Sequence, residues 1–240
     1  MQHPLEARYR AVWDSTRKNA RLTDEGVAGS RFYFDFPGSE RVPIPKRFDT
    51  FAIVCGLPFS SEVQAAFEKH WRHCLAVLGN PLAYGVEPQN RHTEIFLFQR
   101  PEEIFPRDQV DRAIAESLSI ARQMRSFNVK WCFPFMTPDG TIVAPGYDEP
   151  AGIVDELRLN LRNHVSTYPR KQSQWMHVSL GRILEPLSDA RCTALLQEMD
   201  SRWREVIAEA TIDEWLWIWE KQWYMVDRKL LHRVELRDSQ

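Results

Sequence analysis

An imidazole and a hydroxyl lie two residues apart in the segment 174–183, whose pattern predicts a β-strand with His177 near its start. Alternate side chains of a strand project from the same face, so we expect His177 and Ser179 side by side. An imidazole titrates near neutral pH and can transfer protons, and a hydroxyl can donate a hydrogen bond to a phosphoryl oxygen. The pair suits phosphoryl chemistry, although a histidine near a serine is also a common satisfied polar pair.

A second histidine, His92, stands at the start of the run 92–98, which also reads as a strand. Strand alternation places His92 and Glu94 on one face and Thr93 on the opposite face. The sequence therefore predicts two strands that each present a histidine close to one end.

The elements around the two histidines follow the same order of strand, helix, histidine strand and helix. In the first half, apolar periodicity predicts strand 51–55, helix 61–78, strand 92–98 and helix 107–124. In the second half, it predicts a hairpin of 127–135 and 141–144, helix 150–165, strand 174–183, helix 189–208, and final strands 212–220 and 229–237. Two such units packed together would form a mixed α and β protein with two lobes around a cleft.

In this arrangement the chain resembles the two-histidine phosphoesterase superfamily, the LigT-like cyclic phosphodiesterases, over roughly residues 48–237. Members have an α+β fold of two pseudo-symmetric lobes with small, mainly antiparallel sheets. Each lobe contributes one His-x-Thr or His-x-Ser strand to the cleft, and His177-Val178-Ser179 matches the second motif. The resemblance implies metal-independent cleavage of 2',3'-cyclic phosphates of nucleotides or RNA ends, without a cofactor. The resemblance also implies that His92 and His177 transfer protons and that Ser179 binds the phosphate.

Glu94 departs from the family pattern, which has threonine or serine two residues after the first histidine. A carboxylate about 4 Å from a phosphodiester anion is repelled by about 4 kcal/mol at an effective dielectric constant of about 20, unless it is protonated or paired. Either a cation such as Arg91 or Arg182 offsets Glu94, or Glu94 orients His92, or a bulge brings Thr93 to the phosphate. The fourth alternative is that turnover has been lost.

Aromatic residues offer candidates for stacking a nucleobase. Trp215, Trp217 and Trp219 alternate on a predicted strand and so share one face, for which core packing is the favoured interpretation. Because family members hold a base against aromatic side chains beside the phosphate, Trp175, Trp219 and Tyr224 are the candidates here.

Composition limits the classes of partner. Among 240 residues, 31 basic and 33 acidic side chains leave a net charge of −2, so the chain lacks the excess of positive charge that holds long double-stranded nucleic acid. No segment resembles a signal peptide or a membrane span, and a cytoplasmic protein is expected. Four widely spaced cysteines contain no CxxC pair, so no metal site is predicted.

The first 46 residues are expected to form an extension, helical over 4–20 and a loop or lid over 26–46, ahead of a bilobed domain at 47–240. The leading hypothesis is a cyclic phosphodiesterase. One alternative is a protein that keeps the cleft but binds a nucleotide or a protein partner without turnover. Another is a phosphoesterase for a small non-RNA cyclic phosphate.

Overall fold

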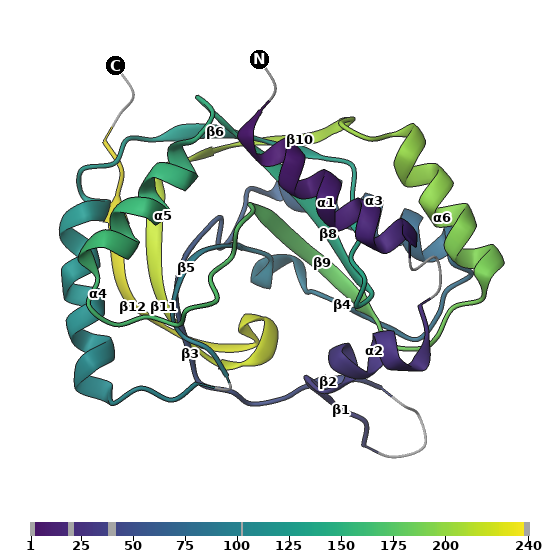
Figure 1. Ribbon diagram of the computed structural model, residues 1–240, viewed down its shortest axis with the longest axis horizontal. Coiled ribbons are helices and arrows are strands. Elements are labelled where there is room, and N and C mark those ends of the chain that lie inside the picture. Colours follow the sequence, from purple (N-terminus) through teal and green to yellow (C-terminus); the bar gives the residue numbers. More distant parts are fainter. Residues whose placement is uncertain (1–2, 19–21, 38–41, 102, 238–240) are drawn as a thin grey trace.

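Two antiparallel sheets form the framework of the fold (Figure 1). The computed structural model describes residues 3–18, 22–37, 42–101 and 103–237. The smaller sheet contains, in spatial order, β12 (Asp227–Glu235), β11 (Glu214–Gln222), β3 (Thr50–Cys55) and β5 (Thr93–Gln99). The larger sheet contains, in order, β10 (Val206–Ile212), β6 (Phe127–Cys132), β8 (Thr141–Glu149), β9 (His177–Ile183) and β4 (Ala83–Gly85), with β7 (Phe135–Met136) paired to β8. The predicted α+β class with two antiparallel sheets is confirmed.

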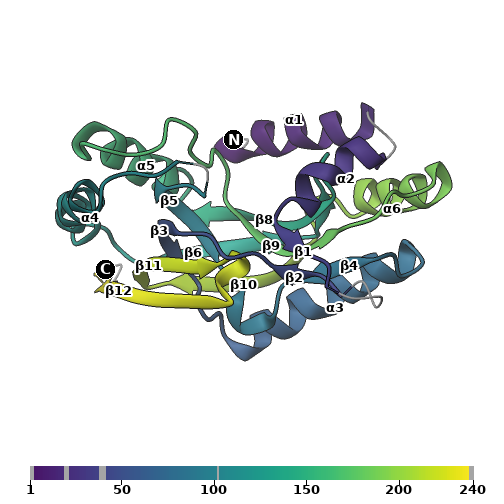
Figure 2. The ribbon, with the colours of Figure 1, turned by 90° about the horizontal axis from the view of Figure 1, so that it is seen from below.

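Each half of the sequence contributes one helix to the other lobe. Helices α4 (Arg107–Ala121) and α5 (Ile153–His164) pack together beside the smaller sheet, whereas α3 (Ser61–Val77) and α6 (Asp189–Ser201) pack together beside the larger one. Figure 2 shows the two pairs at opposite ends of the molecule. The expectation that each half folds into its own lobe is therefore wrong, because α3 and α5 cross between the lobes.

Several predicted boundaries change because strands extend further than expected. β8 continues to Glu149, so α5 begins at Ile153 rather than at residue 150. The helix expected to reach residue 208 ends at Ser201, and Val206 instead begins β10. The remaining short elements are β1 (Phe34–Asp35) paired with β2 (Ile44–Pro45), and the 3-10 turns η1 (Pro88–Asn90) and η2 (Trp223–Met225).

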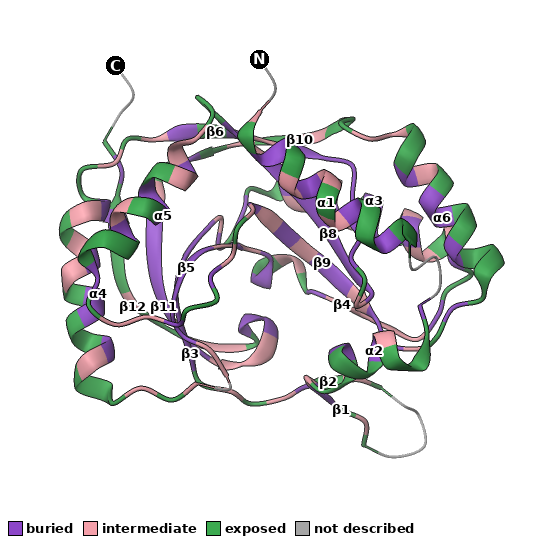
Figure 3. Ribbon diagram, in the orientation of Figure 1, coloured by how far each residue is buried: buried purple, intermediate pink, exposed green. Residues whose placement is uncertain are grey.

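The inner strands of both sheets are mostly buried, whereas the edge strands β10 and β12 and the outer faces of the helices are largely exposed (Figure 3). Trp215 and Trp217 have no exposed surface, which confirms the core interpretation of these two tryptophans. None of the helices in the described part of the chain is long and apolar enough to cross a membrane.

The N-terminal segment contains two helices, α1 (Pro4–Lys18) and α2 (Asp24–Arg31). The prediction of a loop over 26–46 is wrong for 26–31, which lie in α2, where the Thr23 side chain accepts a hydrogen bond from the Gly26 amide at the N-terminus. Residues 19, 20 and 38–41 of the predicted segment lie outside the described residues. Leu5, Tyr9 and Trp13 of α1 are buried in the main hydrophobic core, so α1 is packed as part of the folded body.

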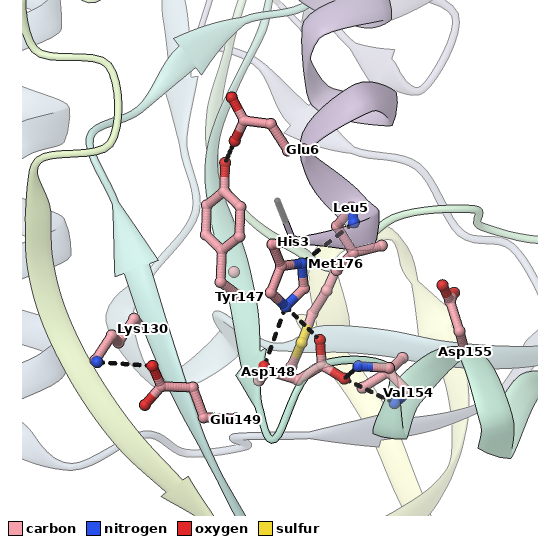
Figure 4. A network of polar contacts seen from close by, with 12 residues as sticks. His3, Leu5, Glu6, Lys130, Tyr147, Asp148, Glu149, Val154, Asp155 and Met176 are labelled. Atoms are coloured by element: carbon pink, nitrogen blue, oxygen red, sulfur yellow. Dashed lines mark hydrogen bonds and ion pairs between the residues drawn. The ribbon is translucent and has the colours of Figure 1, made fainter. Parts of the chain in front are cut away.

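Polar contacts fasten the start of α1 to the larger sheet (Figure 4). His3 Nε2 lies 3.1 Å from the main-chain oxygen of Asp148 on β8, and the Tyr147 hydroxyl donates to Glu6 at 2.7 Å. Asp148 Oδ2 in turn accepts from the amides of Gly152 and Val154, both at 3.0 Å. Because the first amides of a helix have no partner within the helix, this carboxylate stabilises the start of α5.

The Tyr9 hydroxyl joins α1 to the strand that carries His177. It lies 2.5 and 2.6 Å from the main-chain oxygens of Gly146 and Met176, in a fully buried position. The hydroxyl also accepts from the Met176 amide at 3.3 Å. Because Tyr9→Phe removes these buried hydrogen bonds, it should lower the free energy of unfolding by about 1–3 kcal/mol in urea denaturation. The control is Tyr168→Phe, whose hydroxyl makes an exposed contact with Arg162, and equal stability of both variants would contradict the prediction.

Candidate active site

A cavity of about 640 Å³ lies between the two sheets, and both predicted histidines line it. Its volume is in the range of small-molecule binding sites. The polar and charged side chains that line it are Arg8, Thr50, His92, Glu94, Arg100, Lys171, Gln172, Ser173, Gln174, His177, Ser179, Arg182 and Glu220. The sequence-predicted pair of His177 and Ser179 is thus brought together with His92 and Glu94 in one cavity.

Matching bulges determine which side chains of β5 and β9 reach the cavity. The pairing of β5 with β3 skips Ile95, and the pairing of β9 with β8 skips Leu180, each three residues after the histidine. A bulge adds one residue and reverses the alternation beyond it. In a regular strand, Leu97 would share the face of Thr93, and Arg182 would point to the face opposite His177. Because of the bulges, both Leu97 and Arg182 line the cavity.

Side chains cover the open edge of β5 beside the cavity. Leu97 exchanges two hydrogen bonds with the side-chain amide of Gln172, both at 2.9 Å, as a neighbouring strand would. Arg158 of α5 donates to the main-chain oxygens of Glu94 and Ile95 at 3.1 and 2.9 Å. The Leu97 amide and the carbonyls of Glu94, Ile95 and Leu97 thus have hydrogen-bond partners on the side of β5 that pairs with no strand.

His92 is held through one ring nitrogen. Its Nδ1 lies 2.8 Å from the main-chain oxygen of Asn90, and because a carbonyl only accepts, Nδ1 carries the proton. The other nitrogen, Nε2, is then the basic atom of the ring. Burial, assisted by the nearby Arg228, lowers the pKa of His92 to about 4, so the imidazole is neutral at pH 7.

His177 lies on the other side of the cavity and packs against Trp175. Their rings are stacked with centroids 4.3 Å apart, and His177 Nδ1 is buried without a hydrogen-bond partner among the described residues. Burial lowers the pKa of His177 to about 3, assisted by the positive charge of Arg158 and by His92. Both imidazoles line the same cavity.

Arg182 is the cation that faces the histidines from β9. Its guanidinium donates to the Tyr224 hydroxyl and, at 3.0 Å, to the Ser30 hydroxyl of α2, and it lies 3.4 Å from Asp139. Tyr224 adopts a left-handed backbone conformation with φ of 62°, which turns its ring toward the cavity wall. The predicted Arg182 and Tyr224 are therefore brought together, and the N-terminal segment helps to hold them.

Three predicted site residues lie outside the cavity lining. Thr93 is fully buried and donates to the main-chain oxygen of His177 at 3.2 Å, so it joins β5 to β9 rather than facing a phosphate. Arg91 is buried in an ion pair with Glu68 of α3 at 2.6 Å. Trp219 packs on Phe51 and donates to Asp49. Strand alternation sends Thr93 and Trp219 to the face opposite the cavity, whereas Arg91 precedes β5.

Two residues important to the site were not predicted from the sequence: Glu220, which lines the cavity, and Arg158, which contacts the backbone beside it. Arg158 is buried, donates to Trp175 O at 3.0 Å as well as to β5, and leaves its Nη1 without a hydrogen-bond partner among the described residues. Its signal in the sequence is a basic residue within the apolar stripe of α5, next to Leu157 and four residues after Val154. Glu220 accepts from Thr50 and from the Met225 amide, and no pattern in the sequence marks it.

Among the described residues, no group of three or more histidine, cysteine, aspartate or glutamate side chains is placed to hold a metal ion.

The arrangement of two sheets with crossed helices is shared with solved structures of LigT and similar proteins. The LigT protein of E. coli without ligand superposes with a TM-score of 0.52 at 12% identity, over 80% of this chain and 99% of that one. The TT0787 protein of Thermus thermophilus gives 0.53 at 13% identity, over 80% and 100%. A conserved Agrobacterium tumefaciens protein of unknown function gives 0.55 at 16% identity, over 83% and 89%.

Comparison of the sequence with protein-family models and with curated proteins finds no match. The resemblance inferred from the two histidine motifs is thus confirmed for the fold by the solved structures.

Proposed function

We propose that the protein is a metal-independent phosphodiesterase that hydrolyses 2',3'-cyclic phosphates of nucleotides or RNA ends. The observation that carries the proposal is the position of His92 and His177 at the starts of two adjacent strands, with both rings and Ser179 on one cavity. One solved LigT structure is a complex with ATP, and a cavity of about 640 Å³ here has room for a nucleotide.

His92 is proposed as the general base. Its Nδ1 proton is committed to the Asn90 carbonyl, so Nε2 carries the lone pair that accepts a proton from the attacking water. The water oxygen bonds to phosphorus, one ribose oxygen leaves, and the product is a nucleoside monophosphate.

His177 is proposed as the general acid that protonates the leaving ribose oxygen. Burial, together with the neighbouring Arg158, His92 and Arg182, lowers the pKa of His177 to about 3 in the protein without ligand. A phosphodiester anion about 4 Å away would stabilise the imidazolium by about 4 kcal/mol, which corresponds to about three pH units. Substrate binding itself would thus prepare His177 to donate.

Ser179 and Arg182 are proposed to bind the phosphoryl oxygens. Ser179 lies two residues after His177 on the same face, and the bulge at Leu180 turns Arg182 to that face as well. A hydroxyl and a fixed guanidinium beside the developing charge would stabilise the transition state.

The proposal is tested by offering a panel of 2',3'-cyclic mononucleotides and short RNAs with a cyclic phosphate end to the protein in the presence of EDTA. We expect cleavage to nucleoside or RNA monophosphates, with a bell-shaped dependence on pH because one histidine must be neutral and the other protonated. Product chromatography shows which ribose oxygen leaves. Absence of cleavage by folded protein across this panel would reject the proposal.

A second candidate is a nucleotide-binding protein without turnover, favoured by one observation: a carboxyl group, Glu94, lines the cavity where the family pattern has a hydroxyl. It predicts saturable binding of the same cyclic nucleotides in calorimetry with no product formed. A small non-RNA cyclic phosphate, such as a cyclic phosphate of ADP-ribose, belongs in the same panel.

A further inference from the structure

The Glu94 carboxyl faces the cavity without a partner. Two residues after His92, it occupies the position that Ser179 occupies after His177, and both side chains line the same cavity. Among the described residues, no hydrogen bond or ion pair of the Glu94 carboxyl is present. An unpaired carboxylate in a partly buried site would be costly, so the group must either be neutral or find its partner in the ligand.

The cations proposed from the sequence do not neutralise Glu94. Arg91 is committed to Glu68, and Arg182 contacts Tyr224, Ser30 and Asp139. Glu94 also does not orient His92, since Nδ1 of that ring is held by the Asn90 carbonyl. The bulge at Ile95 leaves Thr93 on the far side, hydrogen-bonded to His177 O.

The charged groups that act on Glu94 lie on α5, on β11 and directly after its own strand. Arg158 of α5 and Arg100 just beyond β5 favour the carboxylate, whereas Glu220 of β11 opposes it. Burial is the largest influence and raises the pKa of Glu94 to about 7. On its own strand, His92 is neutral at this pH.

We propose that Glu94 acts as a neutral carboxylic acid that donates a hydrogen bond to a phosphoryl oxygen, in the place of the family's hydroxyl. The proposal rests on the proposed function for the identity of the phosphodiester. A protonated carboxyl supplies one O–H donor, as a threonine does, whereas its ionised form only accepts and repels the anion. The affinity of the site for phosphodiesters would then be high below pH 7 and would fall as the pH rises above 7.

Glu94→Gln separates donation from titration, because the side-chain amide is a donor of similar shape at every pH. We compare kcat/KM for 2',3'-cyclic AMP, whose charge is constant between pH 5.5 and 8.5. The expected ratio of Glu94→Gln to wild type is near 1 at pH 5.5 and at least 10 at pH 8.5. The control is Glu87→Gln, which removes an exposed carboxylate outside the cavity and should give a ratio near 1 throughout. A ratio for Glu94→Gln that does not change with pH would overturn the proposal.

A second measurement needs no turnover. The side-chain carboxyl of Glu94, assigned by the resonance lost in Glu94→Gln, is titrated by carbon NMR with and without inorganic sulfate, whose charge is constant over this range. An anion that accepts from the acid must stabilise the protonated form, so sulfate should raise the titration midpoint by at least one pH unit. A midpoint unmoved or lowered by saturating sulfate would refute the donor role. A raised midpoint in a protein without turnover would keep the donor role and reject only the phosphodiesterase.

Discussion

Replacing either cavity histidine by alanine is expected to lower kcat for a 2',3'-cyclic nucleotide by about 10²–10⁴-fold, with the fold retained. His92 and His177 lie at the starts of adjacent strands and share one cavity, where one must accept a proton and the other donate it. Because the two act in one step, the double variant should lose much less than the product of the single losses. Turnover of the purified variants and their far-UV circular dichroism provide the measurement.

The matched control is His164→Ala on α5, an exposed histidine outside the cavity whose Nδ1 contacts only Asn160 O. It should leave kcat unchanged. Near-normal activity of His92→Ala or His177→Ala would remove that residue from the mechanism and leave the paired-histidine proposal without support.

Arg158→Met is expected to lower the free energy of unfolding by about 3 kcal/mol, because it removes the donor from one buried and two partly buried carbonyls. The guanidinium contacts the main-chain oxygens of Glu94, Ile95 and Trp175 at 2.9–3.1 Å and so joins β5 to the segment that precedes β9. Methionine keeps most of the apolar volume, which separates the loss of hydrogen bonds from the formation of a cavity. Urea denaturation gives the change in stability.

Arg162→Met, one turn further along α5 and exposed, is the control and should change stability by less than about 0.5 kcal/mol. A second readout comes from NMR titration of His177. The charge of Arg158 helps to lower the pKa of His177, so this pKa should rise in Arg158→Met. Unchanged stability together with an unchanged His177 titration would show that Arg158 is not the link between the two histidine strands.

The folded pKa of Glu94 also determines a pH dependence of stability. It is raised from 4.5 to about 7, so the folded state is favoured below pH 4.5 and loses this advantage as the pH rises toward 7. Substituting glutamine removes that loss, which makes the wild type less stable relative to Glu94→Gln as the pH increases through this window. Urea denaturation of both proteins at a series of pH values measures the difference.

Local patterns in the sequence determined the elements and the histidine motifs. The apolar stripe of α3 follows from a repeat at three and four residues, and the Ser60 side chain accepts from the Val63 amide where the sequence predicts the helix start. The pairing of His177 with Ser179 follows from the two-residue period of a strand, and both line the cavity. These properties depend on neighbours within a few residues, so the sequence displays them directly.

The crossing of α3 and α5 between the lobes, the burial of α1 and the roles of three arginines were decided by the tertiary structure. Arg91 and Arg182 both stand beside a histidine motif in the sequence, yet Arg91 pairs with Glu68 while the bulge at Leu180 turns Arg182 into the cavity. Arg158 reaches β5 from a helix more than 60 residues away in the chain. A bulge depends on the register between two strands, and an ion pair depends on which helix packs there, so neither is encoded in local spacing.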